Sequence, residues 1–247
     1  MPDALLWRPT VIRLGRVGST QDWLRDWARM GAREGLILIA REQTAGRGRL
    51  DHGWESPPGG LYLSLLLRPA IPLSRASQLT MLVSLAAIDA CMEIARVRVR
   101  PKWPNDLLLD GKKLAGVLTE LESDQGQLRY VIIGLGLNVN HVFTRGPLVE
   151  RAISLSMAAG RQFDVGEVAD AFITALGRRY AAFRAGESPH RAWAEDLEPL
   201  GRRVRVERPG RPRLLGVAEG VSAEGALLVR DDAGLRHTVW AGDVVIA

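Results

Sequence analysis

The sequence contains a single cysteine, Cys91, which excludes an internal disulfide framework. One thiol in 247 residues is typical of a protein that works in a reducing compartment, so we expect a cytoplasmic location. The chain does not open with a basic segment followed by an apolar run, and no signal peptide is expected. Its longest apolar stretch, Leu79 to Ala95, is interrupted by Asp89 and Glu93, which argues against a membrane span.

Motifs for metal binding and covalent catalysis are also missing. The four histidines lack the spacing of metal ligands, so we expect no metal ion held by protein side chains. The sequence has no Gly-x-x-x-x-Gly-Lys-Ser/Thr phosphate loop and no Gly-x-Ser-x-Gly nucleophile motif. Any phosphate chemistry therefore has to rely on positioning and charge neutralisation.

The net charge of +5 and the pI of about 10.0 are compatible with a nucleic-acid partner. However, the basic residues are scattered among acidic ones along the whole chain. Because no basic segment stands out, the pattern favours an enzyme over a nucleic-acid-binding module, and we expect no DNA partner.

Lysine and asparagine are rare in this chain and unevenly placed. Only three of the 33 basic residues are lysines, and there are only three asparagines. All six lie between positions 102 and 140: Lys102, Lys112, Lys113, Asn105, Asn138 and Asn140. Arginine replaces lysine easily at a solvated surface but not in a tight site, so the cluster indicates a functional site. Chance clustering is the alternative.

The apolar pattern predicts an α+β fold. Strands are expected at residues 11–17, 35–40, 61–68, 97–103, 113–121 and 128–140. Helices are expected at residues 73–95, 164–185 and 189–197, and another is expected to open at residue 19 with Trp23, Leu24 and Trp27 on one face. Ser19 to Asp22 has the pattern of a capping box, and Asp110-Gly111 that of a tight hairpin. After Gly201, short apolar runs separated by glycine turns predict a small barrel. We therefore expect a catalytic domain at residues 1–199 and a barrel domain at residues 200–247.

A loop rich in glycine and arginine, Gln43 to Arg49, follows the second expected strand. Alternating glycines and arginines offer exposed amides and strong donors to an anion. The loop lacks the third glycine of a dinucleotide fingerprint, and Pro57-Pro58 prevents a helix from following it. We interpret it as an anion-binding loop; a plain surface loop is the alternative.

Two further segments place unusual residues on strands. Lys102 to Asp106 ends one strand, and Lys113 to Gly116 begins the next strand across the hairpin, so the two can face the same site. In the strand at residues 131–140, Gly134, Gly136 and Asn138 share one face while the opposite face is entirely apolar. A face without side chains suits a flat ring system, although close packing of a helix is an alternative reading.

Taken together, these segments resemble the biotin protein ligases. The resemblance covers Ser19-Thr20, the loop from Gln43 to Trp54, residues 102–116 and residues 134–138, in the family's order. It implies a mixed β-sheet with flanking helices, similar to the class II synthetases, followed by an SH3-like β-barrel. One departure is Asp51-His52, where the family often carries glycine and then a basic residue, and this bears on how the loop closes.

The resemblance implies a two-step reaction with biotin and MgATP. Biotin's carboxylate attacks the α-phosphate to give biotinyl-adenylate and pyrophosphate, and a lysine of a biotin carboxyl carrier protein then takes the biotinyl group. Mg²⁺ would be held mainly by the phosphates. The implied catalytic residues are Arg47, Arg49, Lys113 and Asp106. The implied biotin contacts are Ser19, Thr20, Gln43, Gly46, Arg47, Gly116, Gly134 and Gly136. The implied ATP contacts are Arg49, Trp54, Asn105, Lys113 and Asn138.

Two alternatives to this function remain open. A lipoyl or octanoyl ligase has a related fold, but the polar set of Ser19, Thr20 and Gln43 favours an acid with a hydrogen-bonding head group. A nucleic-acid-binding barrel at the C-terminus is the alternative from another class. No helix-turn-helix precedes Val11, so a DNA-binding repressor role is not expected. A membrane partner is not expected either, and a homodimer is possible.

Overall fold

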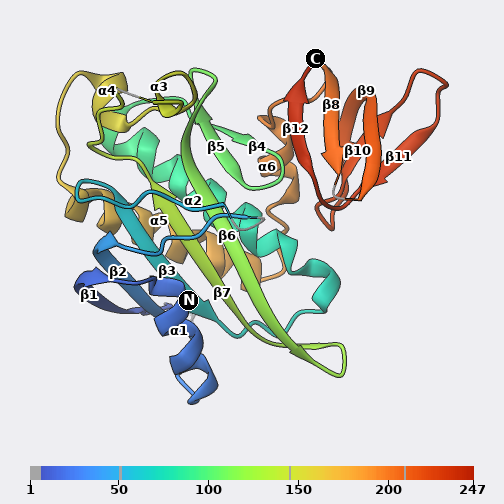
Figure 1. Cartoon of the computed structure of the whole chain (residues 1–247). Coiled ribbons are helices and arrows are strands. Elements are labelled where there is room, and N and C mark those ends of the chain that lie inside the picture. Colours follow the sequence, from blue (N-terminus) through green and yellow to red (C-terminus); the bar gives the residue numbers. More distant parts are fainter. Residues whose placement is uncertain (1–6, 50–51, 145, 209) are drawn as a thin grey trace.

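A seven-stranded mixed sheet forms the main part of the computed structural model, which describes residues 7–49, 52–144, 146–208 and 210–247. The strand order is β1-β2-β3-β7-β6-β5-β4. Only β1 and β2 are parallel; the other neighbours are antiparallel (Figure 1). The strands are β1 (Thr10–Val17), β2 (Leu36–Gln43), β3 (Leu61–Leu67), β4 (Arg100–Lys102), β5 (Asp106–Leu109), β6 (Lys112–Asp124) and β7 (Gln127–Leu137). The predicted mixed sheet with flanking helices is confirmed.

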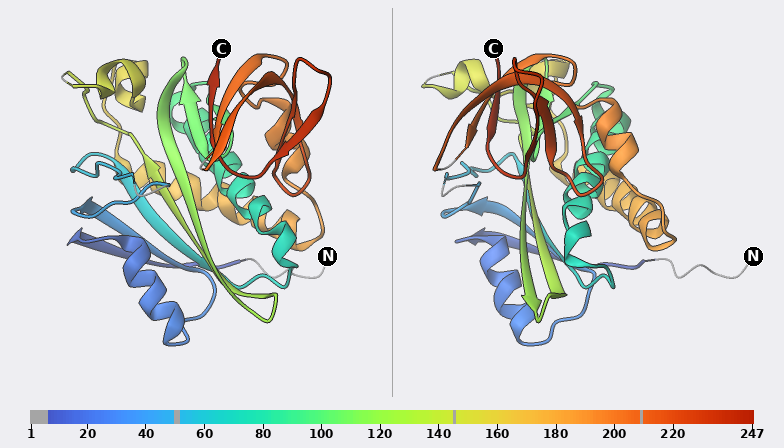
Figure 2. Two further views of the ribbon diagram at one scale, coloured as in Figure 1. Left: turned by 45° about the vertical axis from the view of Figure 1, so that its right-hand side comes forward. Right: turned by 90° about the vertical axis from the view of Figure 1, so that its right-hand side faces the viewer.

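The two faces of the sheet carry different helices. Figure 2 shows α2 (Ser77–Ala95) and α5 (Val165–Arg184) together on one face, and α1 (Thr20–Arg29) on the other. The core lies between the sheet and the α2–α5 layer. The shorter helices are η1 (Leu73–Arg75), α3 (Leu148–Arg151), α4 (Leu155–Ala159) and α6 (His190–Glu195).

Strand β7 separates the core from the opposite face. Ile133, Leu135 and Leu137 are buried in the core with residues of α2 and α5, as their period-two spacing predicts. Gly134 and Gly136 point the other way, so this face of the strand carries no side chain at two successive positions. The sequence-based division of the strand into two faces is correct, and it places the core and the bare surface back to back.

The apolar segment Leu73 to Ala95 is long and hydrophobic enough to cross a membrane by length and composition. Its two acidic residues therefore do not by themselves exclude a span, contrary to the expectation from sequence. In the fold, however, most of it is buried inside the protein: α2 packs against α5 and the sheet as a core helix. Cys91 lies fully buried in this helix, where burial raises the pKa of its thiol to about 12.

Helix starts agree only partly with the predicted capping. Ser19 is the N-cap residue of α1, but its side chain makes no capping hydrogen bond, so the predicted capping box does not form. Asp164 does cap α5, because its Oδ1 accepts hydrogen bonds from the amides of Gly166 and Glu167 at 2.6 and 3.2 Å. The hydroxyl of Ser19 is therefore not used for capping, although the residue is only 3% exposed.

The C-terminal part forms a separate antiparallel sheet of five strands in the order β11-β10-β9-β8-β12. These strands are β8 (Arg203–Arg208), β9 (Arg211–Val221), β10 (Leu227–Arg230), β11 (Arg236–Val239) and β12 (Asp243–Ile246). The arrangement agrees with the expected SH3-like unit. It packs beside β4 and α6 at one end of the main sheet (Figure 1). Trp103 and Trp193 share one apolar cluster with Val204, Val206 and their neighbours, so the two parts have a common core.

Trp103 joins the two parts of the molecule, and we expect Trp103→Ala to lower the free energy of unfolding by about 3–5 kcal/mol. The indole is 1% exposed and its Nε1 donates a hydrogen bond to the carbonyl of Gly225 at 2.9 Å. Trp23, which is 42% exposed, provides the control, and Trp23→Ala should cost less than about 1 kcal/mol. Urea denaturation of both variants measures the difference. Equal small losses would show that the indole is not a structural link.

Candidate active site

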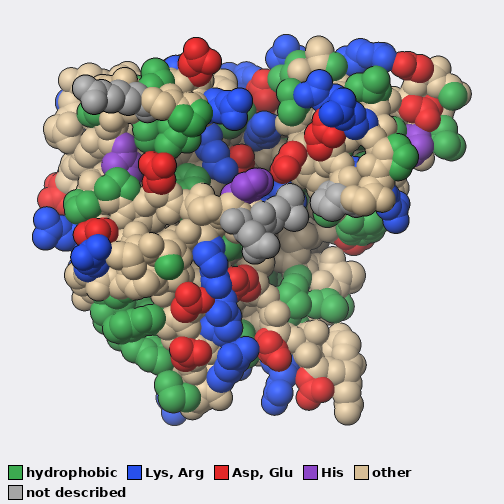
Figure 3. Space-filling model, viewed as in Figure 1, with side chains coloured by type: hydrophobic (Ala, Val, Ile, Leu, Met, Phe, Trp, Pro, Cys, Tyr) green, Lys and Arg blue, Asp and Glu red, His purple; other side chains and the backbone are tan. Residues whose placement is uncertain are grey.

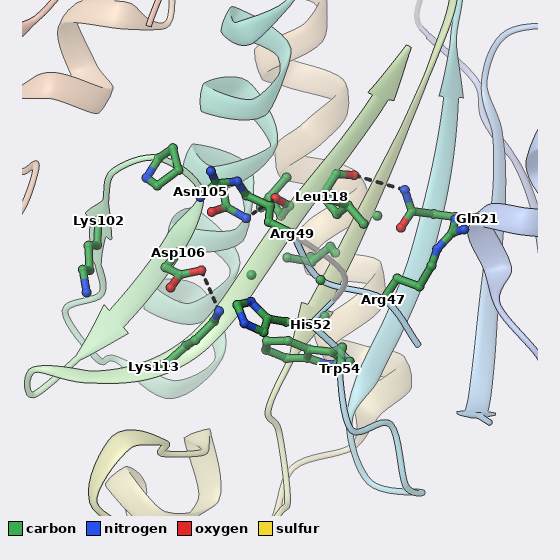
Figure 4. Close-up of a pocket in the computed structure, with 18 of the residues that line it drawn as sticks. Gln21, Arg47, Arg49, His52, Trp54, Lys102, Asn105, Asp106, Lys113 and Leu118 are labelled. Atoms are coloured by element: carbon green, nitrogen blue, oxygen red, sulfur yellow. Dashed lines mark hydrogen bonds and ion pairs between the residues drawn. The ribbon is translucent and has the colours of Figure 1, made fainter. Parts of the chain in front are cut away.

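A cavity of about 320 Å³ opens on the face of the main sheet opposite α2 and α5. The floor comes from β3, β5, β6 and β7, and the walls come from the start of α1, the loop after β2, and β12 of the C-terminal sheet. Figure 4 shows Gln21 and Arg47 at one side of the cavity and Lys102 at the other. The predicted residues that line it are Ser19, Thr20, Gln43, Arg47, Arg49, Trp54, Asn105, Asp106, Lys113, Gly116, Gly134 and Gly136.

One cross-strand row defines the floor. Tyr62 of β3 pairs with Gly136 of β7, which pairs with Gly116 of β6, then Asp106 of β5 and Lys102 of β4. Directly paired residues of antiparallel strands lie on the same face, so all five positions are on the face that bears the cavity, and all except Tyr62 line it. The antiparallel register thus places Gly136 of β7 and Gly116 of β6 in one row with Asp106 and Lys102.

The bare strip over the glycines is covered by side chains of the protein itself. An added Cβ at Gly136 would lie 2.5 Å from Nε1 of Trp54, and one at Gly134 would lie 2.7 Å from Oε1 of Gln21. Gly116 has Trp54 over it as well, at 3.3 Å from its added Cβ. The indole of Trp54 therefore lies over Gly136 and Gly116, and the expectation that these glycines receive the ring of a ligand stays a prediction. At Gly134 the alternative reading of helix packing applies, because Gln21 belongs to α1.

The closed end of the cavity is polar. Oε1 of Gln43 accepts hydrogen bonds from the amide and the hydroxyl of Thr20 at 2.9 and 3.0 Å. The Thr20 hydroxyl also lies 2.7 Å from Oγ of Ser64, and Nε2 of Gln43 donates to Ser56 at 3.1 Å. Thr20 and Ser64 are buried, so this chain of polar groups presents fixed donors and acceptors at the end of the cavity.

The centre of the cavity holds charged pairs. Nζ of Lys113 lies 2.7 Å from Oδ1 of Asp106 and 5.3 Å from the centre of the Trp54 ring, which is within cation–π range. Arg49 reaches the C-terminal sheet, with its Nη1 3.5 Å from Oδ1 of Asp243 and 3.4 Å from the carbonyl oxygen of Gly242. The two parts of the molecule therefore both contribute charge to one cavity.

Arg47 belongs to a network of four charges at the rim of the cavity. Its Nη1 lies 3.0 Å from Asp22 and its Nη2 3.0 Å from Glu120. Arg25 pairs with the same two acids, at 2.8 and 2.5 Å. Burial opposes the charge on Arg25, but its hydrogen bonds and ionic contacts with Glu120 and Asp22 outweigh that effect and raise its pKa. Two arginines thus share two carboxylates, and Arg47 is held at the edge of the cavity.

The two sides of the loop after β2 pair with each other. Gln43 forms an isolated antiparallel β-bridge with Ser56, and Arg47 forms another with Gly53. The amide of Trp54 donates to the carbonyl of Gly46 at 2.9 Å. These bonds bring Trp54 back over the glycines of the floor. Gly46 does not itself line the cavity; an added Cβ there would lie 2.5 Å from the carbonyl oxygen of Trp54. Asp51 lies outside the described residues.

The two asparagines with predicted nucleotide contacts serve the framework of the sheet. Nδ2 of Asn105 donates to the carbonyl of Val117 at 2.7 Å, although the residue still lines the cavity. Asn138 is 5% exposed, does not line the cavity, and donates to the carbonyl of Ile153 at 3.1 Å. The side chain of Asn138 therefore positions the ends of β6 and β7, and the structure does not bring it to the cavity.

Beside the cavity, on the same face of the sheet, Tyr62 and His141 fix the end of the loop. The Tyr62 hydroxyl donates to the carbonyl of Pro57 at 2.8 Å and lies 2.9 Å from Nε2 of His141. Burial raises the pKa of Tyr62. Burial also lowers the pKa of His141, opposed by its hydrogen bond to Pro57 and by Glu55. Both groups are therefore uncharged near neutral pH, and as neutral hydrogen-bonding partners they hold the segment at residues 57–60 in place.

Several residues that line the cavity or hold its rim were not identified from the sequence. Ser64 is the one serine in the otherwise apolar strand β3, and a single serine in such a strand could have indicated a site residue. Asp22 and Glu120 lie on predicted elements, but nothing in their spacing indicates that they share Arg47. Asp243 comes from the C-terminal sheet, whose contact with the loop has no trace in the local pattern.

The cavity combines a polar recess with concentrated positive charge and no visible metal centre. Among residues 7–49, 52–144, 146–208 and 210–247, no group of three or more His, Cys, Asp or Glu side chains is placed to hold a metal ion. Nε1 of Trp54 is buried without a hydrogen-bond partner there, so the ring over the floor retains a free donor. Such a cavity is suited to an acid with a polar head group and to phosphates.

Comparison with known proteins shows which families the chain is similar to. Residues 14–138 match the profile of the Biotin/lipoate A/B protein ligase family, and residues 200–246 match the Biotin protein ligase C terminal domain. The chain is 36% identical to the bifunctional ligase/repressor BirA of Bacillus subtilis, covering 92% of this chain and 71% of that protein. It is 34% identical to the biotin–[acetyl-CoA-carboxylase] ligase of Paracoccus denitrificans, covering 84% and 88%.

A solved structure is also similar over nearly the whole chain. Biotin protein ligase from Aquifex aeolicus in complex with biotin and ATP superposes with a TM-score of 0.82 at 30% sequence identity. The match covers 96% of this chain and 98% of the Aquifex chain, so both sheets and their connection are common to the two proteins.

The contact between Trp54 and the glycine floor leads to a testable expectation. Gly136→Val should force the indole off the sheet, because the added Cβ overlaps the ring, and should destabilise the protein by about 1–3 kcal/mol. Chymotrypsin should then cleave after Trp54 several times faster, as followed by mass spectrometry. Gly220→Val in β9 is the control, since nothing lies within 4 Å of its added Cβ. Unchanged cleavage after Trp54 in a folded Gly136→Val protein would contradict the contact.

Proposed function

The chain belongs to the biotin protein ligases of the biotin/lipoate A/B protein ligase family, and from this premise we propose how its own residues carry the reaction. It is an ATP-dependent ligase that converts biotin and MgATP to biotinyl-5′-AMP and pyrophosphate. It then transfers biotin to a lysine of a biotin carboxyl carrier protein. The observation that best supports the residue assignment is the single cavity in which a polar recess leads into a cationic centre.

The polar recess is proposed to bind the biotin head group. Thr20, Gln43 and Ser64 already form a connected set of hydrogen bonds, so their orientations are fixed before a ligand arrives. Ser19 lines the same recess. A fused ring with a ureido group offers both donors and acceptors to such a set, whereas an aliphatic chain would leave these buried polar groups unpaired. This difference favours biotin over an octanoyl or lipoyl acid.

The cationic centre is proposed to hold the carboxylate and the α-phosphate. Lys113 reaches this region from β6 of the floor and Arg49 from the loop after β2, and each lies near a carboxylate, that of Asp106 and that of Asp243. Arg47 would leave Asp22 and Glu120 to meet the incoming acid. Positive charge on both sides of the reacting groups reduces the repulsion between two anions and stabilises the negative charge that develops as the bond to pyrophosphate breaks.

The indole of Trp54 is proposed to stack on adenine, with Asn105 beside the nucleotide. The indole lies over Gly116 and Gly136, and its buried Nε1 has no hydrogen-bond partner among the described residues. Both features support a ring that can stack on a base bound in the same cavity. Asn138 is proposed to act from the framework, by fixing the ends of β6 and β7 near the nucleotide site. Mg²⁺ would be held mainly by the phosphates, and the chemistry that it supplies is charge neutralisation.

Asp106 is proposed to orient the acceptor lysine in the second step. It faces the cavity from β5 and already holds an ammonium group, that of Lys113, at 2.7 Å. A carboxylate that binds one ammonium can bind the lysine of the carrier when Lys113 turns to the phosphate. The Asp106 carboxylate accepts a proton from that ammonium. The resulting amine attacks the carbonyl carbon of the mixed anhydride, and AMP leaves with the electrons of the broken C–O bond, while the second proton of the nitrogen passes to solvent.

We also propose a division at residues 199/200 between the catalytic domain (1–199) and the C-terminal domain (200–247). The first strand of the second sheet begins at Arg203, which supports a boundary close to Gly201. For partners we propose the carrier protein without DNA or membrane, and a cytoplasmic location. Basic and acidic side chains alternate over the face drawn in Figure 3, which supports the absence of a nucleic-acid surface there.

The function is tested by incubating the purified protein with MgATP and biotin, lipoate or octanoate, and then measuring bound products by mass spectrometry. Biotinyl-adenylate alone is the expected product. An octanoyl- or lipoyl-adenylate would assign the chain to the related acyl ligases. No adenylate with any of the acids would contradict an adenylating activity.

Lys113→Arg should slow adenylate formation by roughly 100-fold although the charge is kept. A planar, longer guanidinium displaces one of the two reacting groups by about an ångström in a site built around an ammonium. Lys112→Arg is the matched control, because the Lys112 ammonium donates to the carbonyl of Val149 outside the cavity. Pyrophosphate release is measured for both. Full activity in both variants would contradict a specific role for Lys113.

A further inference from the structure

The lysines and arginines that line the cavity differ in whether they have an acidic partner. Arg47 pairs with Asp22 and Glu120, Arg49 with Asp243, and Lys113 with Asp106. Lys102 lines the same cavity, and within the described part of the chain no carboxylate lies within 4.0 Å of its ammonium. Among the described residues its ammonium therefore has no direct ion pair, and Asp106, its cross-strand neighbour, pairs with Lys113 instead.

The position of Lys102 is set by the cross-strand row. It pairs directly with Asp106, so both side chains project from the same face of the sheet. Figure 4 shows Lys102 beyond Asp106, at the side of the cavity farthest from Gln21 and Arg47. Lys102, a half-buried residue, thus extends the cationic centre away from the polar recess.

The geometry of nucleotidyl transfer indicates which group of ATP lies near Lys102. In a displacement at phosphorus, the attacking and leaving oxygens are roughly in line on opposite sides of the phosphorus atom. If the acid occupies the recess at Thr20 and Gln43, its carboxylate approaches the α-phosphate from that side. The leaving diphosphate must then lie on the opposite side, toward Lys102.

We propose that Lys102 binds the β- and γ-phosphates of ATP and neutralises the pyrophosphate that leaves when the adenylate forms. In this step a carboxylate oxygen forms a bond to the α-phosphorus, and the bond from that phosphorus to the bridging oxygen breaks. The electron pair of that bond stays on the pyrophosphate, whose new negative charge is met by the ammonium. Lys102 has no part in the second step, since pyrophosphate has then left.

This inference rests on the proposed function, and the test separates the two. Wild-type protein, Lys102→Gln and the control Lys112→Gln are compared in biotin-dependent ATP–pyrophosphate exchange. They are also compared in transfer of biotin from preformed biotinyl-adenylate to the carrier protein. For Lys102→Gln we expect the KM for MgATP and for pyrophosphate to rise about tenfold or more, because a charge-assisted hydrogen bond to phosphate is lost. Transfer from the adenylate should be unchanged, and Lys112→Gln should match the wild type in both assays.

Two results would overturn the assignment. Unchanged exchange with slower transfer would place Lys102 on the surface that meets the carrier, and unchanged rates in both assays would leave it without a role in the reaction. Absence of exchange in the wild type would instead overturn the proposed function, and this inference with it. If Lys102→Gln also lowers the Tm, Lys102→Arg provides the second variant. It keeps the charge, and its KM for pyrophosphate should lie closer to the wild-type value than to that of Lys102→Gln.

Discussion

Strand β7 has to meet two opposite requirements, and the rest of the structure follows from how it meets them. One face must be apolar to close the core against α2 and α5, and Ile133, Leu135 and Leu137 supply that face. The other face must let side chains lie close to the backbone, and Gly134 and Gly136 allow this for Gln21 and Trp54. Two glycines weaken an isolated strand. Here the strand is central, with β3 and β6 bonded along its length, so its neighbours stabilise what the glycines alone would not.

The charges of the cavity are held by contacts weak enough to be exchanged. Arg47, Lys113 and their acidic partners keep between 23% and 42% of their side chains exposed, and pairs of this kind contribute about 1 kcal/mol or less. Such pairs set the orientation of the cations and limit their mutual repulsion before substrate binds. A polyphosphate that contacts several cations at once gains more than any one of these pairs, because charge-assisted hydrogen bonds contribute about 1.5–3 kcal/mol each. The free protein is therefore ordered yet open to substrate.

Most of the fold and the floor of the site could be predicted from the sequence because both depend on local patterns. Period-two alternation identified the two faces of β7, and Asp110-Gly111, both with positive φ, fixed the hairpin that brings Lys113 back to Asp106. Contacts between distant segments could not be predicted, since periodicity reports which face is buried and not what covers it. The indole of Trp54 over Gly136, the pairing of Arg47 at the rim, and the framework role of Asn138 all belong to this second class.

The junction with the C-terminal sheet depends on main-chain atoms of that sheet. The side chains of Ser77, Gln78 and Trp103 donate to the carbonyl oxygens of Glu224, Ala223 and Gly225 in one turn. Gly225 has a φ of +91°, and an added Cβ would lie 2.9 Å from the Cβ of Ser77. Because the acceptors are carbonyls, the turn can change its other side chains over evolution without losing its attachment, provided that the glycine is kept. The C-terminal unit can thus diverge in surface character, and so in the proteins it meets, while its placement beside the catalytic cavity is inherited unchanged.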